Sequence, residues 1–354
     1  MKDATSNFTP QRLLQLRHLE GLTQRELAES LGVSQALISG CERGTKTLPS
    51  AAIDLLLAEY SYPESFFTDL PSCISGCSST FRKKASTSQR EINYTTALLQ
   101  EASGLYTTLG ETIQSIPFDP PTPDCIEAVS RKLRLRNNLS PTEPIRNMTR
   151  FLERLGIAVV RNLGTGVNVD GLSLPNSGSY PVIFASDNLP GDRQRFTLAH
   201  ELAHLIYDTE GESNEARAHA FAGALLLPEE IARAEISESL TLFGYGRLKS
   251  NYGISIGAAI QRGKQLGLIS DRRFRSLRIQ ISSKGWNTSE PGEVTKEPPV
   301  LLKQAVTYAE GTSLASAWKR VPPSLLNRWI EREPEFPNPP ANVIPFPKGT
   351  NNVY

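Results

Sequence analysis

The first third of the chain carries apolar residues with the period of an α-helix. Between residues 9 and 67 the apolar positions recur every three or four residues and are separated by turn residues, which predicts a run of short helices. Thr9 and Pro10 open the first helix, because proline suits the first helical position. After a Ser-, Cys- and Gly-rich linker over residues 68–87, a longer amphipathic helix is predicted from about residue 88 to residue 115.

The remainder of the chain contains both the two-residue period of β-strands and the 3.6-residue period of α-helices. Short apolar, partly β-branched runs at residues 157–160 and 181–185 predict strands. Helical spacing predicts helices at residues 144–155, 192–207 and 214–227, and several small ones over 241–280. Residues 334–354 are rich in Pro and Asn and predict an unfolded tail. The expected fold is therefore multi-domain and mainly α, with a small β-sheet.

Composition fits a globular protein, with 39% hydrophobic and 21% charged residues. The chain contains no run of about 18 apolar residues, so no membrane span is predicted. The N-terminus lacks the pattern of a secretion signal. The four cysteines are too few for a disulfide framework, and Cys73 and Cys77 have no second cysteine pair with which to form a structural zinc site. We therefore expect reduced thiols and a cytoplasmic protein.

Residues 22–43 contain the signals of two short helices joined by a tight turn. Thr23 and Glu26, three residues apart, form a capping box that starts the first helix. Gly32 supplies the left-handed conformation that ends it, and Ser34 caps the second helix. Two such helices with a Gly-containing turn form a helix-turn-helix unit.

The same residues resemble the XRE family of lambda-repressor-like domains, over about residues 9–67. The likeness rests on Thr-Gln-x-x-Leu-Ala-x-x-Leu-Gly-Val-Ser from residue 23 and on Ile-Ser-x-x-Glu-Arg-Gly from residue 38. It implies binding to a DNA operator, with Gln24 at the phosphate backbone and the second helix toward the major groove. The residues that it implies for this helix and its cap are Ser34, Gln35, Ala36, Ser39 and Arg43.

The charge of this segment leaves the partner open. The whole chain has a net charge of +1, but residues 1–67 hold six Lys and Arg against eight Asp and Glu, a net charge of −2. Phosphate contacts normally supply much of the affinity for DNA, so the segment is poorly equipped for it unless Arg82-Lys83-Lys84 folds close by. Recognition of another protein, including another XRE-type domain, is the alternative.

The four histidines are unevenly distributed, and His200, His204 and His219 fall within twenty residues. The run His200-Glu201-Leu202-Ala203-His204 fits the H-E-x-x-H pattern. Four residues on a helix place both imidazoles on one face, where they can hold one zinc ion. Glu201 then lies to the side and can act as general base. The alternative is an amphipathic helix with two ordinary histidines.

A catalytic zinc site needs a third protein ligand and an open fourth position. The next predicted helix offers Glu215 and His219, four residues apart, and Glu210 and Glu212 are the other nearby carboxylates. Spacing does not choose among them. Two His and one Glu also suit iron, manganese or cobalt, although zinc is the usual occupant.

Residues 192–228 resemble the ImmA/IrrE family of metallopeptidases. The likeness rests on Arg-Gln-Arg-Phe-Thr-Leu-Ala-His-Glu-Leu-Ala-His and on Glu-x-x-Ala-x-x-Phe-Ala-x-x-Leu-Leu-Leu-Pro, and extends weakly over 144–280, including Asp170-Gly171-Leu172-Ser173. It implies a zincin-like α+β domain with Glu215 as the third ligand. The family more often has Asn where this chain has His219, which is expected to orient substrate, stabilise an oxyanion or pack beside the ligands.

These segments suggest four parts. We expect the helix-turn-helix domain at 1–67, a linker and long helix at 68–123, the metallopeptidase domain at 124–285, and a helical extension with a Pro-rich tail at 286–354. The long helix predicts either a homodimer contact or packing within one chain.

Two functions follow from the combination. In the first, a regulatory zinc endopeptidase cleaves or controls an XRE-type repressor or antitoxin, as the ImmA/IrrE resemblance implies. In the second, a DNA-binding transcriptional regulator uses the metallopeptidase-like domain as a sensor or dimerisation module. The presence of Glu201 favours the first, because a purely regulatory domain has no chemical need for a general base.

Overall fold

The computed structural model describes most of the chain from residue 8 to residue 304. The described residues are 8–68, 80–83, 88–112, 118–121, 125–162, 169–174, 180–207, 212–304, 321–322, 325 and 329. The tail predicted over residues 334–354 lies outside them.

Five helices form the N-terminal part: α1 (Pro10–Leu19), α2 (Gln24–Ser30), α3 (Gln35–Glu42), α4 (Ser50–Tyr60) and α5 (Glu64–Thr68). The predicted capping box is present, since the Thr23 backbone N–H donates to Glu26 Oε2 at 2.6 Å and the Glu26 N–H donates to Thr23 Oγ1 at 3.2 Å. Gly32 has a φ of 64°, and Ser34 Oγ accepts from the backbone of α3. The local signals of the helix-turn-helix unit are thus confirmed.

A four-stranded sheet lies at the centre of the molecule, in the order β1-β3-β4-β2. Its strands are β1 (Thr80–Lys83), β2 (Ala158–Asn162), β3 (Val169–Leu174) and β4 (Val182–Ser186). β3 is antiparallel to both neighbours, with Leu172 opposite Phe81 and Phe184, whereas β2 and β4 are parallel. The sheet therefore has mixed topology, and β1 forms the edge next to β3.

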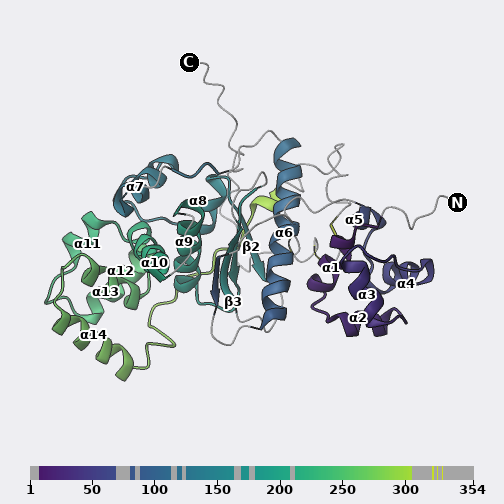
Figure 1. The fold of residues 1–354 in the computed structure, drawn as a ribbon. Helices are drawn as coiled ribbons and strands as arrows, with labels where there is room; N and C mark the ends of the chain where they lie inside the picture. Colours follow the sequence, from purple (N-terminus) through teal and green to yellow (C-terminus); the bar gives the residue numbers. More distant parts are fainter. Residues whose placement is uncertain are drawn as a thin grey trace, which may run out of the picture.

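Helices cover both faces of this sheet (Figure 1). α6 (Gln89–Thr112) packs on one face, while α8 (Met148–Arg154) and α9 (Gly191–Tyr207) pack on the other. The alternation along β4 explains the two layers: Val182 and Phe184 join the core on the α6 side, and Ile183 and Ala185 join the core on the α9 side. Both faces are buried, which is why this strand reads as a continuous apolar run.

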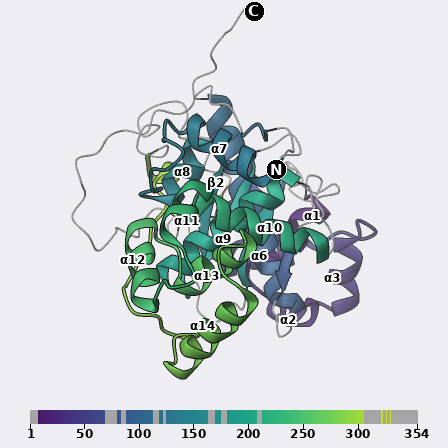
Figure 2. The same cartoon turned by 90° about the vertical axis from the view of Figure 1, so that its left-hand side faces the viewer.

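The remaining helices gather around α9 (Figure 2). They are α7 (Ile126–Arg136), α10 (Glu212–Leu226), α11 (Glu229–Glu235), α12 (Leu242–Tyr252), α13 (Ile256–Gln265) and α14 (Asp271–Ser283). α10 packs against α9, α7 and α13, so helices contact it on several sides. This arrangement places α9 between the sheet and α10.

The N-terminal helices are attached to the long helix through a buried polar contact. Arg12 of α1 forms an ion pair of 2.5 Å with Glu101 of α6, and both side chains are less than a tenth exposed. Gln15 donates to Glu101 at 3.1 Å and to the Ala97 carbonyl at 3.0 Å. Apolar side chains of α1 and α6 belong to the same core, so the helix-turn-helix domain packs directly on α6.

The structure adds elements that the apolar pattern did not reveal. β1 lies within the expected linker, β3 includes the polar and flexible pair Asp170-Gly171, and α7 holds five charged side chains. The two strands break the apolar pattern on which the prediction relied, whereas Ile126, Val129 and Leu133 of α7 do follow helical spacing and were overlooked among its charged residues. Among the described residues, the structure contains no helix with the length and apolar character that crossing a membrane requires.

Candidate metal centre

The H-E-x-x-H run lies in the second half of α9, where the helix is buried between the sheet and α10. His200 is fully buried and His204 is 5% exposed. Their Nε2 atoms are 3.1 Å apart, so the two rings point at one location from the same face of the helix. Two imidazole lone pairs facing each other repel unless a proton or a cation lies between them.

α10 brings a carboxylate to this location. Glu215 Oε2 lies 3.3 Å from His200 Nε2, and Glu215 Oε1 lies 3.3 Å from His204 Nε2. A tetrahedral ion with bonds of about 2.0–2.1 Å separates its ligand atoms by about 3.3–3.4 Å, so the three side chains fit one zinc ion in chemistry and spacing. The Glu215 side chain is 42% exposed, which leaves the cluster accessible from this side.

Glu201 is fully buried beside the two histidines and is held by strand β3. Ser173 Oγ donates to Glu201 Oε2 at 2.9 Å. At Gly171 an added Cβ would lie 2.3 Å from Thr197 Cγ2 and 3.1 Å from Glu201 Oε1, so only glycine permits this approach of strand to helix. The Gly171-Leu172-Ser173 run therefore shapes the environment of the Glu201 carboxylate.

His219 lies on α10, one turn beyond Glu215. Its ring centroid is 4.7 Å from that of His200 and 5.6 Å from that of Phe196. His200, Glu215 and His219 have ligand atoms within 4.8 Å of one another, so His219 borders the cluster. Glu210 lies outside the described residues, and so does the side chain of Glu212.

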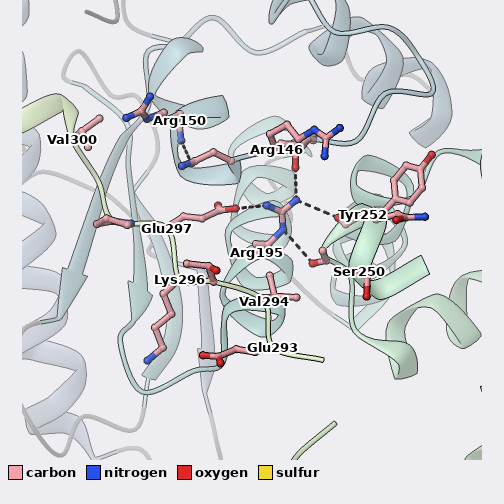
Figure 3. Close-up of a pocket in the computed structure, with 16 residues that line it drawn as sticks. Arg146, Arg150, Arg195, Ser250, Tyr252, Glu293, Val294, Lys296, Glu297 and Val300 are labelled. Atoms are coloured by element: carbon pink, nitrogen blue, oxygen red, sulfur yellow. Dashed lines mark hydrogen bonds and ion pairs between the residues drawn. The ribbon is translucent and has the colours of Figure 1, made fainter. Parts of the chain in front are cut away.

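The first half of α9 is anchored by a buried arginine (Figure 3). Arg195 pairs with Glu297 and donates to the carbonyl oxygens of Ile145 at 2.6 Å, Gly253 at 3.1 Å and Tyr252 at 3.2 Å. The Arg195 side chain thus connects α9 to the segment before α8, to the end of α12 and to the segment after α14. Because Arg195 lies five residues before His200, these bonds fix the helix that carries the histidines.

A second buried ion cluster supports the same half of the helix. Lys249 of α12 pairs with Asp192 at 2.8 Å and with Glu290 at 3.1 Å. Glu290 also accepts from the backbone N–H groups of Ile256 at 2.8 Å and Gly257 at 3.0 Å, at the start of α13. α9 is therefore held against α12 and α13 by charge-assisted hydrogen bonds.

The residues expected to contact DNA lie on α3, at its two caps Ser34 and Arg43, and at Gln24 of α2. Gln35, Ala36 and Arg43 are exposed and Ser39 is partly buried, on one face of the helix. The Ser34 hydroxyl is occupied as the helix cap. Gln24 donates to Glu42 Oε2 at 2.7 Å, so its amide is bound within the domain. Arg82 and Lys83 belong to β1 of the sheet rather than to helices α1–α5.

Comparison with known families agrees with both parts of this structure. Residues 11–60 match the family model of a helix-turn-helix domain. Residues 152–264 match the Peptidase M78 model, described as an IrrE N-terminal-like domain. The chain joins a helix-turn-helix domain to an IrrE N-terminal-like domain. This confirms the family resemblance and the mainly α fold with a small sheet.

More distant comparisons add little. A search of the curated proteins finds no match. A solved structure titled Mycobacterium tuberculosis transcriptional regulator aligns with 45% of this chain at 17% identity and a TM-score of 0.31. The alignment spans 51% of that regulator, about half of its length.

Sequence reasoning pointed to the two histidines, Glu201 and Glu215, and the structure brings all four side chains together. The sequence patterns did not predict roles for Ser173 and Arg195. Both residues lie within the stretches that carry the ImmA/IrrE resemblance, which was the signal that could have identified them. Residue spacing along the chain indicates no role for either.

Proposed function

We propose that the protein is a regulatory zinc-dependent endopeptidase directed by its helix-turn-helix domain to an XRE-type repressor or antitoxin. The observation that carries the proposal is the convergence of His200, His204 and Glu215 within 3.1–3.3 Å of one another, with the buried Glu201 beside them. Two imidazoles and one carboxylate form the ligand set of a catalytic zinc site, and the remaining carboxylate suits a general base.

The chain's own residues would divide the reaction as follows. His200, His204 and Glu215 hold the ion, and a zinc ion there supplies Lewis acidity toward a carbonyl oxygen and lowers the pKa of water. Glu201 accepts a proton from the attacking water through its carboxylate and returns it to the nitrogen of the leaving amine. Ser173 keeps the carboxylate oriented by its hydrogen bond to Oε2. His219, at the border of the cluster, is placed to contact the substrate carbonyl.

A protein target is consistent with the charge of the N-terminal part. Residues 1–67 carry a net charge of −2, which disfavours strong binding to phosphate backbones. The domain also packs on α6 through the Arg12–Glu101 pair, so a partner bound by it would be held near the metallopeptidase-like part of the same chain. Effective concentration then favours cleavage of that partner.

The test combines metal analysis with a survey of new protein N-termini in cells that express either wild-type protein or Glu201→Gln. We expect about one zinc per chain in both proteins, and new N-termini in helix-turn-helix repressors only with the wild type. Zinc-loaded wild-type protein that generates no new N-termini would reject the peptidase. Absence of zinc uptake by the purified protein on titration would reject the site.

A second candidate function, DNA-dependent regulation, is favoured by the exposed α3 face of Gln35, Ala36 and Arg43. It predicts selective binding of the full chain to duplexes from a randomised DNA library. Arg43→Ala should weaken that selection, whereas Lys46→Ala, just beyond the helix, serves as the matched control for loss of charge. If no preferred DNA sequence is recovered, DNA-dependent regulation is rejected and the function directed at a protein partner is retained.

A further inference from the structure

A pocket of about 730 Å³ opens beside the metal cluster, on the side of α13 and α14. His219, whose ring lies 4.7 Å from that of His200, is part of its wall, and Thr197 of α9 is another part. The pocket and the cluster are therefore built on the same two helices, α9 and α10, and His219 borders both. A peptide with its scissile carbonyl at the cluster would have an adjacent side chain at the mouth of this pocket.

The pocket is spacious because small residues face it. Ala216 and Gly223 of α10 and Ala258 of α13 line it, and none fills the space between the helices. The rings of Phe196 and Phe274 supply apolar surface. A volume of this order falls within the range of pockets that bind small ligands, so it accommodates a long side chain.

The charged groups of the lining are mostly cationic. Arg193 and Arg278 both line the pocket, against a single carboxylate at Asp170. Arg278 is exposed and forms no ion pair within the described part of the chain. The nearby Glu290 is already engaged, because it pairs with Lys249 and caps the start of α13.

Two amides add hydrogen-bond donors to this side. Gln261 and Gln265, on successive turns of α13, are exposed at the pocket, and no other described residue is hydrogen-bonded to either side chain. Guanidinium and amide N–H groups are the donors that carboxylates prefer, and guanidinium binds carboxylate with two parallel bonds. A lysine or arginine side chain would instead meet two like charges.

We propose that this pocket receives an acidic side chain, of aspartate or glutamate, next to the scissile bond of the substrate, and that Arg278 and Arg193 select it. The inference rests on the proposed peptidase function and specifies its substrate class. Arg278 is then a specificity-determining residue, whereas the metal ligands and Glu201 take no part in selecting the substrate side chain.

The test measures binding rather than turnover. Dipeptide hydroxamates carrying a Glu, Gln or Lys side chain next to the hydroxamate are titrated into the zinc-loaded full chain by calorimetry. We expect the Glu compound to bind at least about tenfold more tightly than the Lys compound, since the latter places like charges together. Arg278→Glu should reverse this order, and Arg193→Glu should weaken it.

Arg272→Glu is the matched control, because Arg272 is exposed on the same helix and does not line the pocket. It should leave the preference unchanged. Equal affinities for the Glu and Lys compounds, or a preference that persists in Arg278→Glu, would overturn the inference. So would zinc-loaded protein that binds none of the hydroxamates. A clear acidic preference without any proteolysis in cells would instead support the pocket and reject the peptidase function.

Discussion

The hydroxyl of Ser173 donates a hydrogen bond of 2.9 Å to Glu201 Oε2, and both side chains are buried. Ser173 belongs to β3 and Glu201 to α9, so the bond crosses from the sheet to the helix that carries the histidines. A carboxylate in that position has few alternative orientations. The strand therefore positions the proposed general base as well as supporting the helix.

Replacing Ser173 tests this positioning role. Ser173→Ala should lower kcat on a cleaved repressor about tenfold, as expected for loss of a hydrogen bond to a charged group, with little change in KM. Ser173→Thr keeps the hydroxyl and should restore most of the rate, while zinc content stays the same in both variants. Unchanged kcat in Ser173→Ala would exclude the role, and loss of zinc would indicate a structural one.

Metal content should distinguish the ligands from their neighbour. His204→Ala and Glu215→Ala each remove one of the three converging atoms, so both should lose most of the roughly one zinc per chain. His219→Ala removes a side chain at the border of the cluster and should retain the metal. Zinc measured by atomic emission after dialysis decides the matter. Full occupancy in Glu215→Ala would remove that residue from the ligand set.

Glu153 predicts a pH dependence of stability. Burial raises the pKa of this carboxyl to about 7, although it accepts from the N–H groups of Val300 and Leu301 and lies near Arg150 and Arg161. The folded protein then holds a proton that the unfolded chain has released above a pH of about 4.5. The free energy of unfolding should fall by about 3 kcal/mol as the pH rises from 4.5 to 7 and change little above that.

Urea unfolding at several pH values checks this dependence, with Glu153→Gln as the comparison. The amide stays neutral throughout and can still accept from the two backbone N–H groups, so the variant should lose this part of the slope. Tyr106 has a pKa raised by its own burial and by Glu153, and stays protonated over the whole range. Parallel curves for the two proteins would show that Glu153 does not titrate in this window.

The contact between the helix-turn-helix domain and α6 can be tested by a double substitution. Arg12→Met leaves the buried carboxylate of Glu101 without its cation and should reduce the free energy of unfolding by about 3 kcal/mol. Arg12→Met with Glu101→Leu removes both charges and should recover most of that loss. Equal destabilisation of the single and double variants in urea would show that shape, rather than charge, holds the two parts together.

Local sequence signals predicted the elements that form locally. The Thr23–Glu26 capping box, the glycine at residue 32 and the Ser34 cap involve residues within a few positions of one another, and all appear as expected. The two histidines of α9 also belong to this class, because a spacing of four places side chains on one face of any helix. The apolar pattern did not predict strand β3, because Asp170 and Gly171 interrupt its apolar run.

Contacts between distant residues were decided only by the tertiary structure. Spacing left Glu210, Glu212, Glu215 and His219 open as partners of the histidines, and the family resemblance favoured Glu215. The packing of α10 on α9 brings the Glu215 carboxylate within 3.3 Å of both rings. Ser173 reaches Glu201 across 28 positions, and Arg195 reaches Glu297 across 102. Such pairs depend on how helices and strands pack together, so no period or spacing along the chain encodes them by itself.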